Sequence, residues 1–527
     1  MAVRSSGMKL QLLLLLIAIV SVAALARFYA LDRIPPGVYA DEAINGNEGI
    51  DAVRSGNLKI FYPTNQGREG LWINMIGFSE KIFGVNPFGL RFCAALTGTL
   101  SVVFLYLLAA ELFSARTGII GAWLLASSFW HLNFSRIAFS AVLVPLLLTS
   151  SFYFLFRSWR EADQKPVCAS FWPLALLGGT LFGLGFHTYI PFRFAPFLLA
   201  MAILVEYSAC KATKAHAKIW ISVTGCWLTA AGIVALPIGV HFMNHPEDFW
   251  TRARQVSILE TEQPVREFAT NLIRTAGMFH IRGDCEWRHN MACSPELFLP
   301  VGALFLLGMA IAGIEIWRKA PSRHRHFLLF AWFVLFLLPE LLTSEEIPHA
   351  LRAIGVIPPV FVFSGIGGDF LFAQLKSRKA GILGFVLLLA FSGAFEFYRY
   401  FIAWARQPDV AFAFDQPLVD LGRYLNSLPK EEPRYVVTNV EGEPVPHTNP
   451  DGSEELVSMP AQTVIFITQG HPPATYLSAD ELESTKFPHG SVLIPMAADD
   501  QLISELRKRG FVVEKNSLTD MPVTKLR

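Results

Sequence analysis

The sequence has few charged residues for its length. Only 17% of its 527 residues are Asp, Glu, Lys or Arg, whereas 53% are hydrophobic and 13% are aromatic. Soluble domains usually carry about 25% charged residues, so the composition argues against an ordinary soluble protein. The net charge is +1, which gives no reason to predict a nucleic-acid partner. A composition of this kind is typical of a chain that crosses a membrane several times.

Cysteine is scarce as well, and no CxxC or histidine-rich spacing of the metal-binding kind occurs. Two of the six cysteines, Cys285 and Cys293, lie eight positions apart in one polar segment. An oxidising compartment would favour a disulfide between them over two free thiols. The others fall in or beside apolar segments and are expected to be ordinary thiols: Cys93, Cys168, Cys210 and Cys226.

Long apolar segments dominate the first 400 positions. About eleven of them approach the roughly 20 residues that an α-helix needs to cross a bilayer. The third, fifth and sixth are short, so their ends are the least well defined. The segments lie near residues 9–31, 90–113, 117–131, 138–156, 172–187, 193–208, 219–241, 297–317, 326–342, 353–372 and 381–402.

The connectors between these segments alternate in charge. If the N-terminus lies in the cytoplasm, every cytoplasmic connector contains Lys or Arg, for example Arg116, Arg157 and Arg325, as the positive-inside rule requires. We therefore predict a multi-pass protein of the plasma (inner) membrane, with a first apolar segment that is a span rather than a cleaved signal peptide. The segments predicted to lie outside are the loops 32–89 and 242–296, the turns 131–137 and 343–352, and the tail after residue 403.

The predicted fold class is mainly α, with a bundle of about eleven transmembrane helices. The first outer loop should add two juxtamembrane helices, over residues 41–54 and 69–83, the second with an apolar stripe suited to the membrane surface. The chain is expected to divide into a transmembrane domain, residues 1–403, and an extracytoplasmic α/β domain, residues 404–527. In the tail, helices are predicted for residues 415–428 and for DDQLISELRKRG, and strands for RYVVTNV, TVIFIT, SVLIPM and FVVEK.

Two adjacent carboxylates, Asp41 and Glu42, follow the first apolar segment in the phrase YADEA. One interpretation is that they solvate the loop or cap a helix, although Ile44 does not complete a capping box with Asp41. The other interpretation is chemical. A carboxylate near the lipid headgroups can remove a proton from an acceptor hydroxyl or amine that attacks an activated carbon on a lipid carrier.

The phrase GLWINMIGFSEKIFGVNPFGLR at residues 70–91, together with YADEA on this topology, resembles the GT-C glycosyltransferases. The similarity is to the protein O-mannosyltransferase family (glycosyltransferase families 39 and 83) and its aminoarabinose lipid A transferase relatives, and it covers residues 9–400. It implies a GT-C-like bundle and a membrane glycosyltransferase, either hexosyl- or pentosyltransferase. The implied donor is a polyprenyl-phosphate-linked sugar, and the implied acceptor is an extracytoplasmic protein, lipid A or envelope glycan.

By this resemblance Asp41 corresponds to the catalytic acid and acts as general base, with Glu42 as its supporter. The resemblance also implies that the anomeric carbon is inverted and that the phosphate carrier leaves. Two departures leave the substrate type open. Bacterial relatives often have Lys-Pro-Pro where this chain reads NQGREGLW, and several have an acid soon after the position of Arg136, where this chain has none.

A polyprenyl phosphate calls for cations at the outer membrane edge, and the planar, permanently charged guanidinium of arginine suits phosphate. An arginine that begins a span can instead snorkel to the headgroups, whereas the compact run GDCEWRHN has no such anchoring role. The residues predicted to bind donor phosphate or substrate are Arg68, Glu69, Arg136, His187, Tyr189, Arg193, Asp284, Arg288, His289, His349 and Arg352.

We expect no required metal or other cofactor, because the Asp41–Glu42 pair is a thin ligand set and arginines can neutralise the phosphate. Two other classes of protein fit the topology: a transporter or flippase of lipid-linked sugars, and a lipid-linked oligosaccharide ligase or polymerase. A transporter is disfavoured, because the polar groups gather at the outer edge rather than at the midplane and the chain shows no internal repeat. The sugar, the acceptor and the carrier length stay open.

Overall fold

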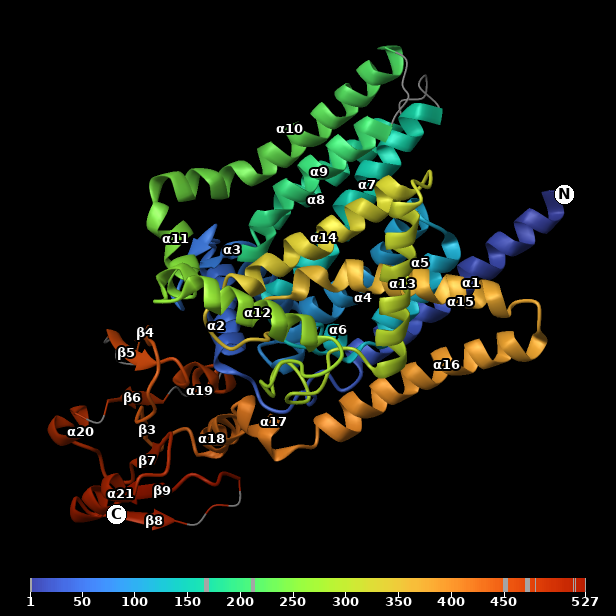
Figure 1. Cartoon of the computed structure of the whole chain (residues 1–527). Coiled ribbons are helices and arrows are strands. Elements are labelled where there is room, and N and C mark those ends of the chain that lie inside the picture. The colour runs from blue at the N-terminus through green and yellow to red at the C-terminus, as the bar shows by residue number, and fades with distance from the viewer. Residues whose placement is uncertain are drawn as a thin grey trace. The chain divides into compact units, whose positions relative to one another are not determined.

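The computed structural model describes residues 2–164, 170–209, 214–448, 454–469, 474–478, 480–514, 516 and 518–526. The chain forms two compact units, and Figure 1 labels their helices and strands. The first unit comprises Met1–Tyr29, Glu69–Leu71 and Ala94–Trp404, and the second comprises Ala30–Arg68, Trp72–Cys93 and Ala405–Arg527. Cys93 and Cys226 are free thiols, whereas Cys168 and Cys210 lie outside the described residues.

The first unit is a bundle of apolar helices. Nine helices in the described part of the chain are long and apolar enough to cross a membrane, so the predicted fold class of a polytopic, mainly helical membrane protein is confirmed. They are built on α1 (Ala2–Phe28), α4 (Pro87–Leu112), α7 (Leu143–Gln164), α9 (Ala195–Ala209), α10 (Lys214–Asn244), α13 (Leu299–Trp317), α14 (Arg323–Leu341), α15 (Ile357–Leu375) and α16 (Lys379–Tyr398).

Two of the about eleven predicted spans are shorter than a full membrane span in the part of the chain that the structure describes. The apolar runs 117–131 and 172–187 form α5 (Ala115–Ser127) and α8 (Phe171–Gly185), which have 13 and 15 residues. A helix needs about 20 residues to cross the hydrocarbon core. The first run is divided because Ser128 has a non-helical backbone and caps a new helix, α6 (Phe129–Phe134).

Small residues allow the helices of the bundle to approach closely. A Cβ atom at Gly308 of α13 would lie 1.8 Å from the carbonyl oxygen of Phe363 in α15. A Cβ atom at Gly179 of α8 would lie 2.1 Å from the carbonyl oxygen of Trp227 in α10. Glycine at such crossings permits backbone-to-backbone packing, which is a main source of helix association in lipid.

Polar contacts sort the connectors of the bundle into two groups. In the basic group, Arg325 donates to the Leu112 carbonyl (2.6 Å), and Arg116 pairs with Asp369 (2.9 Å). The other group joins the connectors that were predicted to lie outside. Two helices belong to these outer connectors, α11 (Pro246–Gln255) and α12 (Pro264–Met278), and short 3-10 turns complete them: η2 (Ile190–Phe194), η3 (Ile258–Glu260) and η4 (Ile354–Val356).

The first part of the second unit is the predicted loop with its two helices. They are α2 (Ala40–Ser55) and α3 (Gly70–Phe83), and the segment between them holds the short strands β1 (Phe61–Tyr62) and β2 (Arg68–Glu69). Both predicted helices are therefore confirmed, with ends within one residue. Close packing joins them, because a Cβ atom at Gly77 would lie 2.0 Å from the carbonyl oxygen of Gly49.

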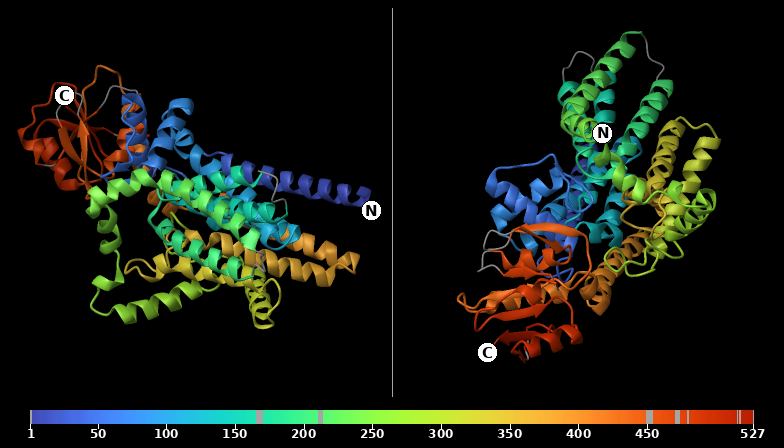
Figure 2. Two further views of the ribbon diagram at one scale, coloured as in Figure 1. Left: turned by 90° about the horizontal axis from the view of Figure 1, so that it is seen from above. Right: turned by 90° about the vertical axis from the view of Figure 1, so that its left-hand side faces the viewer.

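The tail folds around a five-stranded sheet of order β6-β3-β7-β9-β8. Strands β6, β3 and β7 are parallel, and β9 pairs antiparallel with both β7 and β8. Val436 and Val437 of β3 face opposite cores, one covered by α18 and α19 and the other by α20 and α21, so helices cover both faces of the sheet (Figure 2). The helix η5 (Arg399–Trp404) continues from α16 in the first unit. The elements of the tail are α17 (Pro408–Ala413), α18 (Gln416–Ser427), β3 (Arg434–Val437), β4 (Pro444–Thr448), β5 (Glu454–Ser458), α19 (Ala461–Thr468), β6 (Thr475–Leu477), α20 (Glu481–Ser484), β7 (Val492–Pro495), α21 (Asp500–Lys508), β8 (Phe511–Glu514) and β9 (Val523–Leu526).

One predicted strand of the tail is wrong. TVIFIT, residues 463–468, lies in helix α19. The helix buries Val464 and Phe466 as well as the polar Thr463 and Thr468. Because nearly every side of it is covered, its sequence lacks helical periodicity and cannot be told from a buried strand.

Candidate functional site

Helix α2 begins at the carboxylate pair. Its N-cap is Tyr39, whose backbone N–H donates to the Glu42 carboxylate at 3.4 Å. The next amide, Ala40 N–H, donates to Asp415 (3.0 Å). The interpretation that Asp41 caps this helix is therefore wrong. Instead, the half-buried Asp41 carboxylate accepts a hydrogen bond from the Asn65 side-chain amide (2.8 Å).

Glu42 lies in a fully buried ion pair with Arg91. Both side chains are 0% exposed. Arg91 Nε and Nη2 each donate to one oxygen of the Glu42 carboxylate at 2.9 Å. The guanidinium also donates to the carbonyls of Pro35 and Gly37, both at 2.8 Å. Glu42 thus fixes the chain that leads into α2 and has no exposed surface to offer a substrate, so its predicted catalytic role becomes one of positioning.

The loop 64–68 lies over one face of α2. Asp41, Asn45 and Glu48 form a stripe at spacings of four and three on that helix. Arg68 donates to Asn45 Oδ1 (2.6 Å) and pairs with Glu48. Asn65, Gln66 and Gly67 have positive φ angles, a conformation that bends the loop back over the helix. Arg68, which was predicted to bind phosphate, therefore holds in place the loop that carries Asn65.

Another face of α2 is held by the tail. The Asn47 amide donates to Gln462 Oε1 (2.9 Å) and to the Gln462 carbonyl (3.1 Å). The Gln469 amide donates back to Asn47 Oδ1 at 2.6 Å. Thr463 Oγ1 donates to the Val38 carbonyl at 3.0 Å. Sequence analysis missed these residues, since a lone amide side chain in the tail carries no local signal of what it contacts.

Arg136 lies in the first unit at the C-terminal end of α1. It is 0% exposed, and its guanidinium donates to the carbonyls of Ala26, Arg27 and Tyr29 at 2.6–2.9 Å. These are carbonyls that the end of a helix leaves without intrahelical partners. The prediction that Arg136 binds donor phosphate is therefore wrong, because this arginine caps a helix inside the protein.

Arg136→Ala is expected to destabilise the protein by about 3 kcal/mol, since it leaves buried carbonyl groups without donors. Thermal melting of the purified protein in detergent measures the effect. The exposed Arg33, 83% exposed and paired with Asp32, provides the control substitution Arg33→Ala. A melting temperature that Arg136→Ala leaves unchanged would contradict the capping role.

Glu69 and Arg193 form a partly buried ion pair in the first unit. Arg193 Nη2 lies 3.3 Å from Glu69 Oε1, and Nη1 donates to the Phe249 carbonyl (2.7 Å). The guanidinium also stacks 4.0 Å from the centre of the Phe249 ring. Burial raises the pKa of Glu69, and Arg193 partly offsets that rise. These partners occupy Arg193 within the protein.

His187 and Tyr189 lie on the connector before Arg193. His187 Nε2 lies 2.9 Å from the Val234 carbonyl, so this ring is used in packing against α10. Burial raises the pKa of Tyr189, while Arg352 and Arg252 act to lower it.

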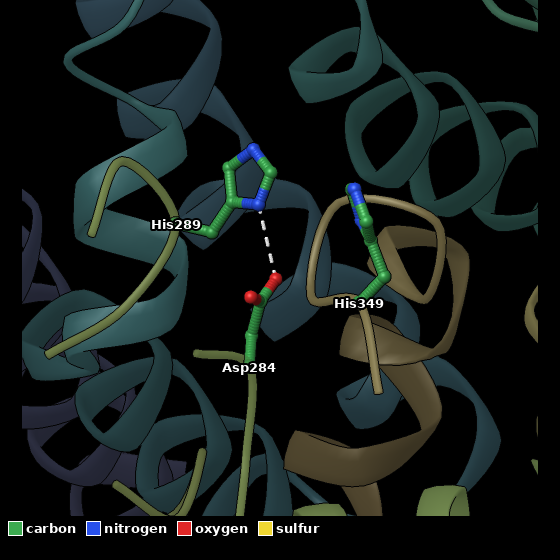
Figure 3. A group of neighbouring side chains, drawn as sticks. All are labelled: Asp284, His289 and His349. Atoms are coloured by element: carbon green, nitrogen blue, oxygen red, sulfur yellow. Dashed lines mark hydrogen bonds and ion pairs between the residues drawn. The ribbon is translucent and has the colours of Figure 1, made fainter. Parts of the chain in front are cut away.

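Three predicted residues meet in a buried cluster of the first unit, which we call the Asp284 cluster: Asp284, His289 and His349 (Figure 3). His289 Nδ1 lies 3.0 Å from Asp284 Oδ2, and the His289 and His349 rings lie 4.6 Å apart. Asp284 also accepts the backbone N–H groups of Ala350 (2.7 Å) and Glu286 (2.8 Å). Two segments far apart in the sequence are thus tied together around one carboxylate.

Electrostatics within the Asp284 cluster shift the pKa values of Asp284 and His349. Burial acts to raise the pKa of Asp284, but the two neighbouring histidines hold it below its usual value. Burial lowers the pKa of His349 well below its usual value, and His289 adds to the effect. Burial and Asp284 together raise the pKa of the adjacent Glu296. His349 is therefore neutral near pH 7 and retains a nitrogen lone pair.

The segment that carries Asp284 is closed by the Cys285–Cys293 disulfide, whose Cα atoms lie 4.0 Å apart. The Asn290 amide donates to the Ser294 carbonyl (2.6 Å) and to Glu296 (3.1 Å). Arg399 of η5 donates to Asn290 Oδ1 at 3.1 Å. Glu296 and Arg399 were not among the predicted site residues, because each sits at the edge of an apolar run.

Arg288 and Arg352 flank the Asp284 cluster in the sequence and keep some exposure. Arg288, with a 20% exposed side chain, pairs with Glu286 at 3.2 Å. Arg352, with a 12% exposed side chain, pairs with Glu345 at 3.5 Å. Arg352 also donates to the Glu345 carbonyl, so both arginines are held by acids of their own connectors while part of each side chain stays exposed.

Comparisons with known proteins agree with this architecture. Residues 70–241 match the sequence profile of the dolichyl-phosphate-mannose-protein mannosyltransferase family. An undecaprenyl phosphate-alpha-4-amino-4-deoxy-L-arabinose arabinosyl transferase from Yersinia enterocolitica is 25% identical over 285 residues, which are 53% of this chain and 45% of that protein.

The fold is shared with a protein of known structure. ArnT from Cupriavidus metallidurans in the apo state aligns with a TM-score of 0.54 at 13% identity over 97% of both chains. ArnT from the same organism bound to undecaprenyl phosphate aligns with a TM-score of 0.50, at the same identity and coverage. The predicted resemblance to the GT-C glycosyltransferases is confirmed. The matches cover 34%, 45% and 51% of the curated relatives' own lengths.

Proposed function

We propose that this protein is a glycosyltransferase that moves a sugar from a polyprenyl-phosphate carrier to an acceptor on the outer side of the plasma (inner) membrane. The observation that carries the proposal is the Asp41 carboxylate, held by Asn65 at the start of the juxtamembrane helix α2. The GT-C-like fold, which is shared with a protein solved with undecaprenyl phosphate, supports it. In this proposal the N-terminus is cytoplasmic, and the tail domain faces outward.

In the proposed reaction, Asp41 acts as the general base. Its carboxylate removes the proton from an acceptor hydroxyl or amine as the oxygen or nitrogen attacks the anomeric carbon of the donor. The new glycosidic bond forms while the bond between that carbon and the phosphate oxygen breaks. Polyprenyl phosphate leaves with the bonding electrons, and the attack from the opposite side inverts the anomeric carbon.

Glu42 and Asn65 are proposed to position this base. The Glu42–Arg91 pair fixes the entry of the chain into α2, one residue from Asp41. The Asn65 amide occupies one oxygen of the Asp41 carboxylate. The other oxygen is then the one that receives the proton. Ordered partners of this kind limit the motion of a catalytic group, which is what preorganisation requires.

Arg288 and Arg352 are the proposed ligands of the donor phosphate. Both arginines lie on the predicted outer connectors, beside the Asp284 cluster, and keep 20% and 12% of their side-chain surface exposed, whereas Arg136 is fully buried on the carbonyls of α1. A guanidinium neutralises phosphate charge without a metal ion. We therefore propose that the transfer step uses no metal on the phosphate.

Arg352→Ala is expected to raise the KM for the lipid-linked donor about 10- to 100-fold, because a charge-assisted hydrogen bond contributes about 1.5–3 kcal/mol. Initial-rate measurements over a range of donor concentrations give the value. The tail residue Arg423, which pairs with Asp420 and has a 57% exposed side chain, supplies the control Arg423→Ala. If the KM is unchanged in Arg352→Ala, then Arg352 does not bind the donor phosphate and only stabilises the turn at Glu345.

The decisive test offers the protein a panel of polyprenyl-phospho-sugars in membranes and searches by mass spectrometry for molecules that gain the mass of one sugar. We expect one donor to be consumed, polyprenyl phosphate to be released, and one class of acceptor to gain mass. Membranes without the protein provide the background. If folded protein moved the intact lipid-linked sugar across the bilayer and no acceptor gained mass, the protein would be a transporter instead.

A further inference from the structure

The tail and the loop that carries α2 and α3 belong to the same compact unit. Helix α19 of the tail packs against α2. Ala40 and Ile44 of α2 lie in one buried cluster with Val445 and Met459 of the tail. The helix that carries Asp41 is therefore packed on the tail, and contacts at its first turn can act on the proposed base.

Asp415 makes the tail contact nearest to Asp41. It stands at the N-cap position of α18, yet its carboxylate makes no capping hydrogen bond with that helix. Instead, Asp415 Oδ2 accepts the backbone N–H of Ala40 at 3.0 Å. Ala40 is the first residue of α2, where backbone N–H groups have no intrahelical acceptor. The tail thus supplies an N-terminal cap to the helix of the proposed base, one residue before Asp41.

The backbone of Asp415 lies in the left-handed region, with a φ angle of +53°. Residues other than glycine seldom adopt this conformation, although Asp and Asn tolerate it better than most. Glycine would fit the backbone with less strain, but it has no side chain to accept the Ala40 N–H. A strained residue that brings an acceptor to another helix points to a function of its side chain.

The neighbouring residues hold Asp415 closely against the chain that enters α2. A Cβ atom at Gly37 would lie 2.0 Å from the carbonyl oxygen of Phe414, so the two backbones are in contact. The Phe414 ring is buried and lies 5.9 Å from the guanidinium carbon of Arg91. This is the guanidinium that pairs with Glu42. These contacts leave Asp415 little freedom of movement relative to the start of α2.

We propose that Asp415 is a positioning residue for sugar transfer, and that the tail is thereby part of the catalytic unit. The inference rests on the proposed role of Asp41 as general base. A base must lie within hydrogen-bond reach of the proton that it removes. Asn65 holds the Asp41 side chain from the loop, and Asp415 holds the preceding peptide group from the tail.

Asp415→Gly is expected to lower the kcat of sugar transfer about 10-fold, because misplacing a catalytic group by about 1 Å can cost up to about 10²-fold. The KM for the lipid-linked donor should not change, because the proposed phosphate ligands Arg288 and Arg352 are untouched. Initial rates of donor consumption by the full-length protein, corrected for its folded fraction, give both values. Hydrogen–deuterium exchange at Ala40 should be faster in this variant. Asp415→Asn keeps an oxygen that can accept the N–H, and it should restore kcat and slow exchange.

The matched control is Gln469→Ala. The Gln469 amide donates to Asn47 Oδ1 at 2.6 Å, so this variant also removes a hydrogen bond between the tail and α2, but farther along the helix from Asp41. Its melting temperature should fall while its kcat stays normal. If folded Asp415→Gly transfers sugar at the unaltered rate, or if its kcat falls no further than that of Gln469→Ala, the proposal is overturned.

Should Asp415→Gly fail to fold, Ala40→Pro removes the same hydrogen bond from the other side. Proline is favoured at the first position of a helix, and Tyr39 before it has a ψ angle of 147°, which a following proline accepts. This variant should show the same fall in kcat, and full kcat in the folded variant would overturn the proposal. If Asp41→Asn loses transfer but neither variant does, only the positioning role of Asp415 is refuted. If the unaltered protein transfers no sugar, the proposed function itself fails and this inference fails with it.

Discussion

Asp41→Asn is expected to abolish sugar transfer while the protein stays folded. The amide has the shape of the carboxylate and can still accept the hydrogen bond from Asn65, but it cannot take up a proton from the acceptor. General-base catalysis contributes about 10²- to 10⁴-fold to a rate, so kcat should fall at least about 100-fold. Donor consumption measured by mass spectrometry, with donor and acceptor at saturating concentrations, gives the value.

The control for Asp41 lies on the same helix. Asp51 of α2 is exposed, so Asp51→Asn makes the same chemical change without touching the proposed base, and it should transfer sugar normally. Melting temperatures of both variants should match that of the unaltered protein. Full activity in Asp41→Asn would show that the base is another group, whereas a large fall in its melting temperature would show that Asp41 is structural.

Arg91→Ala is expected to cause the largest loss of stability of any single substitution proposed. It would leave the Glu42 carboxylate buried without a cation, and it would remove the donors to the Pro35 and Gly37 carbonyls. Breaking a fully buried ion pair from one side costs about 3–5 kcal/mol, because the remaining charge has neither water nor a partner. Thermal melting and resistance to limited proteolysis measure the loss.

A double variant separates the pair from its surroundings. Arg91→Met combined with Glu42→Gln removes both charges and should melt at a higher temperature than Arg91→Ala, because no buried charge is left unpaired. Arg33→Ala, at an exposed pair, should change stability by less than about 1 kcal/mol. If Arg91→Ala melted like the unaltered protein, then the ion pair would not fix the entry of α2.

The fold class could be predicted because hydrophobicity is a local property. A run of some 20 apolar residues crosses a bilayer almost regardless of the residues on either side of it, and the placement of Lys and Arg orients the connectors. Hydrophobicity alone also predicted spans at residues 117–131 and 172–187. It does not reveal the turn at Ser128 that ends α5. It also read TVIFIT as a strand, because full burial hides the period of a helix.

The candidate site was predicted only in part. Asp41 could be singled out because it follows a span within a recognisable phrase, and Asp284, His289 and His349 because polar residues stood out in outer connectors. Their convergence into one cluster depends on which connectors meet, and no local pattern encodes that. Arg136 illustrates the opposite error, because an arginine that caps α1 from 109 positions away has the same sequence context as one that binds phosphate.

The sequence by itself determined that this chain is a multi-span membrane protein with an acidic pair beside the first span and a small α/β tail. These features depend on composition and short-range periodicity. Only the tertiary structure decided which partner each acidic residue has. Glu42 pairs with Arg91, Asp41 accepts a hydrogen bond from Asn65, and Asp284 lies beside two histidines. The physical reason is that a buried charge takes its role from the partners that surround it, and those partners come from distant parts of the chain.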